Sequence, residues 1–254
     1  MQTALVWPAP EDLSGLVDLG YAVRIGVSTA AVVPDARAGV VWLSDGTVRV
    51  CGPESHPWRA GRYGVDVVGV RLSLGAVPAV LGTSALGLVD RRVHLQDVWG
   101  EPAVGLAERM TAAAGSADRL SVLLETIRSR RSASPGVDPL VRVLARRLAL
   151  MAVPVHVLAA EVGLSERQLR RRCETAFGYP PSVLGRLLRL QRFLRSASAA
   201  TPGSPGLAVL AAASGYADQA HLARETRTLT GRAPSAFLAA PTRRTARMAD
   251  PFKT

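Results

Sequence analysis

The sequence has few of the residues on which metal centres, disulfide frameworks and nucleophilic catalysis depend. It holds two cysteines and four histidines, and none of them falls in a CxxC or HxH pattern. Two isolated cysteines form no disulfide framework, which fits a reducing compartment. Scattered His and Cys residues predict no metal site, and a glycine-rich phosphate loop is missing as well. We therefore expect no catalytic residue, no cofactor and no metal.

Long apolar runs are also missing. No segment approaches the roughly 18 uncharged apolar residues that span a bilayer, and the N-terminus lacks the basic region and apolar run of a signal peptide. The sequence thus predicts a cytoplasmic protein with no membrane association. Aromatic residues make up only 5% of the chain, so its cores must be built from Leu, Val and Ala.

Acidic residues are scarce in one half of the chain. Residues 1–136 hold 13 basic and 13 acidic residues, whereas residues 137–254 hold 18 basic and 7 acidic residues, so the whole formal charge of +11 lies in the second half. Such asymmetry predicts a polyanion as the partner of that half, either nucleic acid or an anionic membrane surface.

Residues 1–75 are typical of a β-rich domain. Short runs rich in β-branched residues cover 38–44, 47–52 and 65–74, and Gly, Pro and Asp residues separate them. Asp45-Gly46 between the first two runs is a hairpin signal. Strands at this spacing predict a sandwich or a small barrel.

Helical patterns take over after Gly75. Short turns are expected over 76–89, and longer helices over 99–114 and 116–131. The last of these carries an apolar stripe, which either packs onto the sheet or forms a dimer seam, and packing is the favoured interpretation. The stripe consists of Leu120, Leu123, Leu124 and Ile127.

The segment Ser132–Gly136, SASPG, is the clearest linker in the chain, and the charge balance changes there. We expect an α+β chain in four parts. These are a β-rich sensor or dimerisation domain with a helical extension over 1–132, a linker over 133–137, an all-α DNA-binding domain over 138–240 and a disordered tail over 241–254.

Residues 158–184 have the pattern of a helix-turn-helix. A helix ends at Gly163, Ser165 caps a second helix over 166–177, and Gly178 ends it. The second helix carries four arginines, as a helix that enters a DNA groove would. A long helix from Pro181 to about Ala197 follows.

The same pattern returns about fifty residues later, with one residue inserted in the turn. Two copies in tandem predict two helix-turn-helix units. The matched pairs are Leu158 with Leu210, Gly163 with Gly215, Leu169 with Leu222, Arg171 with Arg224, Gly178 with Gly231, and Pro181 with Pro234.

Over about 140–240 the chain resembles the AraC/XylS family of bacterial transcription regulators. The resemblance is carried by LAAEVGLSERQLRRRC, GYPPS, RLLRLQ, ASGYADQAHLAR and GRAPSAF. It implies two helix-turn-helix units joined by one long helix, which bind promoter DNA and act with RNA polymerase as an activator or a repressor. Cys173 and Thr226 stand where the family usually has phenylalanine, which suggests a smaller core beneath both recognition helices.

The resemblance also implies which side chains meet DNA. Arginine pairs with guanine in the major groove and glutamine with adenine, whereas His221 is as compatible with packing near the turn as with contacting a base. The implied base-contacting residues are Arg167, Arg170, Arg171, Gln219, Ala220, His221 and Arg224. The implied phosphate-contacting residues are Ser165, Arg186, Arg189, Arg192 and Arg227.

The N-terminal part resembles, more loosely, the cupin-like domain of unknown function that precedes this DNA-binding domain in one subgroup. The resemblance is carried by VVPDARAGVVW, VRVCGP and VGVRLSLGAVPAVLG, with Ala36-Arg37 where the subgroup has Gly and a small polar residue. This domain either binds a small-molecule effector, mediates a homodimer or is purely structural. The candidate pocket residues are Trp42, Trp58, Tyr63 and Arg71.

Taken together, these patterns favour a sequence-specific transcription regulator associated with the nucleoid. Two alternatives stay open: a non-specific nucleoid binder, and a DNA-acting enzyme of the alkyl-transfer repair type. The second needs a reactive cysteine in a basic Cys-rich motif, and nothing in this sequence matches one.

Overall fold

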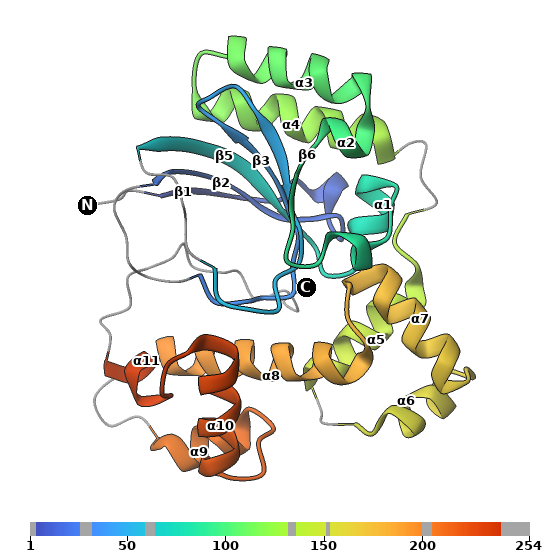
Figure 1. The fold of residues 1–254 in the computed structure, drawn as a ribbon, viewed down its shortest axis with the longest axis vertical. Coiled ribbons are helices and arrows are strands. Elements are labelled where there is room, and N and C mark those ends of the chain that lie inside the picture. Colours follow the sequence, from blue (N-terminus) through green and yellow to red (C-terminus); the bar gives the residue numbers. More distant parts are fainter. Residues whose placement is uncertain are drawn as a thin grey trace.

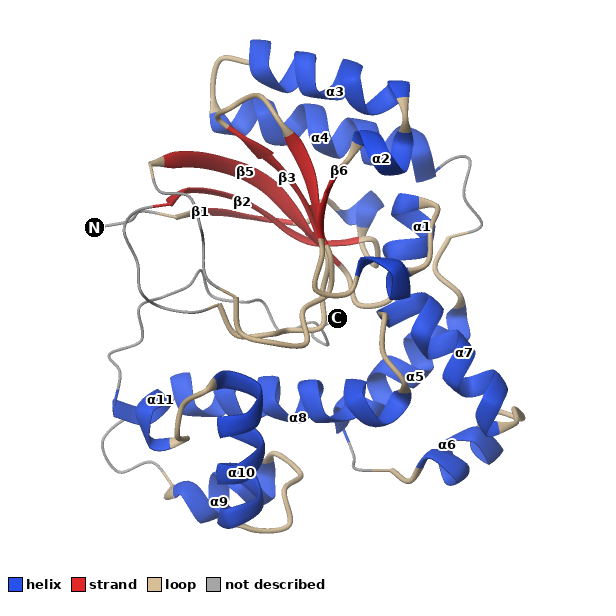
Figure 2. Ribbon diagram, in the orientation of Figure 1, coloured by secondary structure: helices blue, strands red, loops and turns tan. Residues whose placement is uncertain are grey.

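The computed structural model describes residues 4–25, 32–58, 64–131, 136–150, 153–199 and 205–239. Helices cover one face of a β-sheet, and a second group of helices lies beyond the loops on the other side (Figures 1 and 2). The elements in chain order are β1 (Leu5–Pro8), η1 (Glu11–Leu13), β2 (Val17–Ile25), β3 (Gly39–Leu43), β4 (Val48–Cys51), β5 (Val65–Leu72), α1 (Val77–Leu81), η2 (Ala85–Leu88), β6 (Arg92–His94), α2 (Gln96–Trp99), α3 (Glu101–Ala112), α4 (Ser116–Arg131), α5 (Pro139–Leu150), α6 (Val155–Glu161), α7 (Glu166–Phe177), α8 (Pro181–Ser198), α9 (Leu207–Ala213), α10 (Gln219–Thr230) and α11 (Ser235–Ala239).

The strands form one antiparallel sheet in the order β1-β2-β5-β3-β4-β6. The β-rich domain expected from the sequence is confirmed. In the described residues it is an open sheet with β1 and β6 as its edges rather than a closed barrel. The runs 38–44, 47–52 and 65–74 are β3, β4 and β5, and the Asp45-Gly46 hairpin turns at Gly46 with φ 84°.

Helix α4 packs onto this sheet through its apolar stripe. Leu120, Leu123 and Ile127 are buried, and a Cβ at Gly20 would lie only 2.5 Å from Leu120 Cδ2, so Gly20 is what lets the helix approach β2. This confirms packing, rather than a dimer seam, as the role of the stripe. The expected helix over 99–114 is α3, which begins two residues later than predicted because Gly100 (φ 65°, ψ −143°) separates it from α2.

The C-terminal helices are arranged around α8. Helix α7 packs on α8 from one end and α9 and α10 pack on it from the other, so α8 carries both units (Figure 1). The expected turn glycines Gly163, Gly178, Gly215 and Gly231 all have positive φ, between 66° and 85°. Within the described ranges, no helix has the length and apolarity needed to cross a membrane.

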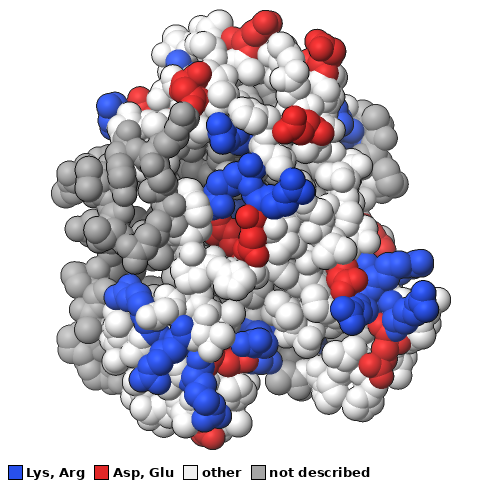
Figure 3. All heavy atoms as spheres, in the orientation of Figure 1, with Lys and Arg blue, Asp and Glu red and all other residues white. Residues whose placement is uncertain are grey.

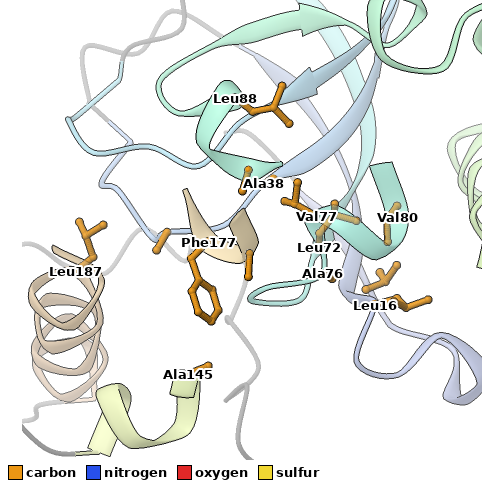
Figure 4. Close-up of a cluster of buried hydrophobic side chains, with 14 of the residues drawn as sticks. Leu16, Ala38, Leu72, Ala76, Val77, Val80, Leu88, Ala145, Phe177 and Leu187 are labelled. Atoms are coloured by element: carbon orange, nitrogen blue, oxygen red, sulfur yellow. The ribbon is translucent and has the colours of Figure 1, made fainter. Parts of the chain in front are cut away.

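The two parts of the chain share a continuous core. The ring of Phe177, at the end of α7, lies among apolar side chains of both parts, including Ala38, Ala145 and Leu187 (Figure 4). A Cβ at Gly178 would lie 2.5 Å from Val89 Cγ2, and Gln191 of α8 donates a hydrogen bond of 2.6 Å to the carbonyl of Pro34. The first unit is therefore packed against the N-terminal part. Most of the expected linker 133–137 and the tail 241–254 lie outside the described residues, so the domain bounds stay a prediction.

Candidate DNA-binding surface

The first candidate recognition helix is α7, and its local sequence determines which side faces outward. The Ser165 hydroxyl accepts a hydrogen bond from the Gln168 N–H at 3.3 Å and the Gln168 side chain accepts one from the Ser165 N–H, which makes a capping box. Leu169, Cys173 and Phe177 recur at helical spacing and are buried. The opposite side of the helix is therefore left to the arginines.

The three predicted base-contacting residues of α7 are all exposed. Arg170 Nε donates to Glu174 Oε1 at 2.8 Å, which holds that guanidinium along the helix surface. Arg167 and Arg171 make no hydrogen bond or ion pair with any residue that the structure describes. Arg172 instead pairs with Asp138 at 2.7 Å. The guanidinium N–H groups of Arg167 and Arg171 are thus available to a ligand.

The second candidate recognition helix, α10, is built on the same plan. The Asp218 carboxylate caps it by accepting the His221 N–H at 2.6 Å, and Leu222, Thr226 and Leu229 are buried beneath it. Gln219, Ala220 and Arg224 are predicted to contact bases, and all three are exposed.

His221 is partly buried against the turn. Its Nδ1 accepts the Ala217 N–H at 3.4 Å, and its ring meets the Tyr216 ring edge-on with centroids 5.3 Å apart. Because Nδ1 is used as an acceptor, the neutral ring carries its proton on Nε2, which lies 3.7 Å from Glu225 Oε1. Of the two roles that the sequence left open, the structure favours packing over base contact.

The predicted phosphate contacts divide into two groups. Arg227 and Ser165 are exposed. Arg186 and Arg189 instead pair with Glu225, at 2.9 Å and 3.3 Å. They face α10 because their spacing on α8 places them on the side that the second unit covers. In this structure both guanidinium groups are therefore engaged by a carboxylate, with the Arg189 side chain 15% exposed and the Arg186 side chain 39% exposed.

Arg192, one turn further along α8, is half-buried. One of its terminal nitrogens is buried without a hydrogen-bond partner in the described part of the chain. Burial and the neighbouring Arg195 and Arg189 lower the pKa of Arg192. Of the α8 arginines assigned to phosphates, none presents a fully exposed guanidinium.

Over the C-terminal helices, basic side chains gather in two separate groups on the face shown in Figure 3, and further basic side chains lie over the N-terminal part. One group lies over α7 and the other over the region of α10 and the far end of α8. Residues 158–240, which include both groups, match a family model described as a helix-turn-helix domain. The C-terminal region is an AraC-type helix-turn-helix domain.

No curated protein matches the sequence of the chain. Among solved structures, ToxT from Vibrio cholerae at 1.65 Å resolution has 9% sequence identity and a TM-score of 0.46, with 93% of this chain and 97% of that chain covered. ToxT from strain O395 bound to (E)-4-(8-methylnaphthalen-1-yl)but-3-enoic acid has 8% identity and a TM-score of 0.46, with 93% and 98% covered. Unsaturated fatty acid bound ToxT from strain SCE256 has 10% identity and a TM-score of 0.45, with 94% of each chain covered.

Outside the AraC-type domain, the predicted pocket residues are not brought together. Trp42 faces α3 and α4, where its Nε1 donates to Thr111 at 3.2 Å and Arg119 lies over its ring. Arg71 lies on the opposite face of the sheet, beside Asp18 and Asp35, because alternate strand residues point to opposite sides.

The remaining two candidates do not complete such a pocket either. Trp58 stacks beneath the Arg92 guanidinium, 3.8 Å from its ring centroid. Tyr63 lies outside the described residues. The interpretation of these four side chains as one pocket is therefore unsupported.

A cavity lies elsewhere, where the AraC-type domain meets α1. Its volume is about 400 Å³, within the range of small-molecule sites. Pro78, Ala79 and Val141 contribute apolar surface to it, and Arg171 and Thr175 reach it from α7. One predicted base-contacting side chain thus also lines an interdomain cavity. No sequence pattern indicated this cavity, because its lining residues come from three separate segments, 75–79, 136–141 and 171–176.

Neither cysteine of the chain has the environment of a reactive thiol. Cys173 is fully buried, and burial raises the pKa of its thiol to about 12; burial also raises the pKa of Cys51. Ser55 Oγ lies 2.7 Å from His56 Nδ1, but Asp90 binds the same hydroxyl rather than the far ring nitrogen, so no relay forms. Within the described ranges, no group of His, Cys, Asp and Glu residues could hold a metal.

Proposed function

We propose that this chain is a sequence-specific DNA-binding transcription regulator whose two recognition helices enter successive major-groove turns of a promoter. The observation that carries the proposal is that two capped helices, α7 and α10, are mounted on the single helix α8, each with an exposed polar side. Successive major-groove turns lie about 34 Å apart, so one chain covers an asymmetric site. RNA polymerase is the partner through which such a protein activates or represses transcription.

In this proposal α7 supplies most of the sequence recognition. Arg167, Arg170 and Arg171 are exposed and reach base edges, where arginine makes bidentate contacts with guanine. Gln219, Ala220 and Arg224 present fewer donors on α10 and adjust the preference for the second half of the site. Arg227 and Ser165 bind phosphates, which position the protein without specifying a sequence.

The test is a comparison of Arg170→Ala with Arg227→Ala after the preferred site has been selected from random duplexes. We expect Arg170→Ala to relax the preference at one base pair, with a cost of about 1–3 kcal/mol for the preferred site only. Arg227→Ala should weaken all duplexes alike. Equal effects of both variants on preferred and unrelated duplexes would contradict these roles.

The same binding data separate this function from non-specific nucleoid binding. Both kinds of protein lose affinity as salt rises, because bound phosphates release their counterions. A sequence-specific regulator keeps a ratio of about 10³ or more between its preferred and unrelated sites at physiological salt. A ratio near one at every salt concentration would favour the non-specific binder.

We also propose that the N-terminal part regulates the DNA-binding domain through an effector held in the cavity between α1 and α7. This placement is supported by Arg171, which lines the cavity and is predicted to contact a base. An effector that holds Arg171 changes what α7 can offer to DNA. A homodimer is the alternative regulatory device, and no contact described above favours it.

A matched pair of variants tests the cavity. Thr175 is a residue of α7 at the cavity, and Thr228 is its equivalent in the second unit. We expect the aromatic anion 1-anilinonaphthalene-8-sulfonate to bind the native chain saturably, and Thr175→Trp to abolish that binding by filling the space. Thr228→Trp should bind the probe normally. Retained binding in Thr175→Trp would place the probe elsewhere.

A further inference from the structure

Glu225 is the buried charge at the centre of the second helix-turn-helix unit. It belongs to α10, and its side chain is 11% exposed. Its Oε1 accepts a hydrogen bond from Arg186 Nε at 2.9 Å and one from Arg189 at 3.3 Å. Three groups surround this carboxylate, because His221 Nε2 also lies 3.7 Å from Oε1. A buried carboxylate without such partners would be strongly destabilising.

This cluster ties two helices together in one orientation. Arg186 and Arg189 are three residues apart on α8, so both reach the same point on α10. The Arg189 guanidinium also lies over the Tyr216 ring, 5.8 Å from its centroid, at the turn before α10. Rotation of α10 about its axis would break both ion pairs and the contact of His221 with the turn.

The first unit has no such cluster among the residues that the structure describes. The residue equivalent to Glu225 in the internal repeat is Arg172, which is about half exposed and pairs with Asp138, just before α5. The charge at this position is therefore opposite in the two units. A carboxylate that draws the arginines of α8 inward is thus a feature of the second unit.

We propose that Glu225 is a positioning residue for DNA recognition, which fixes α10 on α8 and withholds Arg186 and Arg189 from DNA phosphates. The inference rests on the proposed DNA-binding function. Withholding two cations from phosphates lowers the affinity of the second unit for any duplex. The base contacts of α10 then contribute a larger share of its binding free energy. Glu225 thus raises the ratio of sequence-specific to non-specific DNA binding.

The number of phosphates contacted is measured by the slope of log K against log salt concentration, which steepens by about 0.9 for each additional contact with duplex DNA. In the full chain, we expect Glu225→Ala to free both arginines and to steepen this slope by up to about 1.8, on preferred and unrelated duplexes alike. The ratio of the two affinities should fall by about tenfold or more. A residue with a purely structural role would not steepen the slope.

Three further variants control the interpretation. Glu161→Ala removes one carboxylate from the same domain, where it pairs with Arg147, and should leave the slope unchanged. Glu225→Gln keeps an acceptor oxygen in the cluster and should give an intermediate slope even if Glu225→Ala fails to fold. Replacing Arg186 and Arg189 by Gln in the Glu225→Gln background should restore the native slope.

An unchanged slope in both folded Glu225 variants would overturn the inference, whatever their affinities. That result is distinguishable from failure of the proposed function, because the slope on an unrelated duplex is measurable without sequence preference. A native chain that binds every duplex equally would overturn sequence-specific regulation alone. A native chain that binds no duplex would overturn both.

Discussion

Ala36 is one of two non-glycine residues with positive φ in the described ranges, and unlike Asp90 it has no polar side chain that could hydrogen-bond locally. The φ of Ala36 is 60°, in the left-handed region where a Cβ costs about 1–2 kcal/mol. The loop that contains it is fixed on both sides, since Arg37 pairs with Asp18 at 2.5 Å and the Pro34 carbonyl accepts from Gln191. The sequence resemblance indicated a glycine at this position, and the backbone explains why.

Ala36→Gly should therefore stabilise the protein. Relief of the left-handed strain outweighs the loss of about 0.4–1 kcal/mol that glycine causes by loosening the unfolded chain. We expect a gain of about 0.5–1 kcal/mol in the free energy of unfolding, measured by urea denaturation. Ala38→Gly, two residues away without positive φ, should instead lower stability. A loss in both variants would show that the strain at Ala36 is relieved elsewhere.

Residue patterns predicted some side chains well and others badly. Leu169 and Leu222 were placed in the core by their spacing, and both are fully buried. The ion pairs of Glu225 were missed, because the pairing depends on which face of α8 the second unit covers. Helical spacing predicts which side of a helix is buried, but not which element packs against that side.

At the scale of elements, the bounds of helices that have a capping residue or a terminal glycine in the sequence were predicted best. α7 begins at its expected cap, Ser165, and both α7 and α10 end at the expected glycines with positive φ. The start of α3 was placed two residues early, although Gly100 and Pro102 mark it, and the short helix α2 before it was not predicted. β1, β2 and β6 were not located. β1 and β6 are short, but β2 has Val17, Leu19, Tyr21, Val23 and Ile25 at alternate positions, so this strand could have been predicted.

Helix α8 contains one glycine that the fold does not require. Gly185 has no positive φ, and a Cβ there would meet only Leu148 Cδ2, at an ordinary 3.7 Å. Since glycine costs about 1 kcal/mol relative to alanine inside a helix, Gly185→Ala should raise the free energy of unfolding by up to about that amount. The measurement is thermal denaturation followed by circular dichroism. A lower melting temperature would indicate that Leu148 has no room to adjust.

At the scale of the whole molecule, the sequence predicted two parts but not how they meet. The charge change and the linker composition are local signals, and the boundary that they predict near residue 136 stays a prediction. The contact between α7 and the N-terminal part joins residues some ninety positions apart, Val89 and Gly178 among them. No pattern in either segment predicts that the two segments are in contact.

Alanine variants of two equivalent glycines would measure how tightly this interface is packed. Gly178 and Gly231 both end a recognition helix at positive φ, but only Gly178 is crowded. A Cβ at Gly178 would meet Val89 Cγ2 at 2.5 Å, whereas a Cβ at Gly231 would meet no described atom within 4 Å. Both alanine variants carry about 1–2 kcal/mol of backbone strain. Gly178→Ala should lose about a further 1–3 kcal/mol through overpacking. Equal losses in chemical denaturation would show that the interface yields at little cost.

Because α7 packs on the N-terminal part, the two helix-turn-helix units should differ in their free energy of local unfolding. Helix α7 shares a core with the sheet domain, whereas α9 and α10 pack on α8. Backbone amides of α7 should then exchange with solvent deuterium only in openings that also disturb the sheet domain, while those of α9 and α10 exchange through smaller, independent openings. One of the two candidate recognition helices should thus open only together with the sheet, and the other should open separately from it.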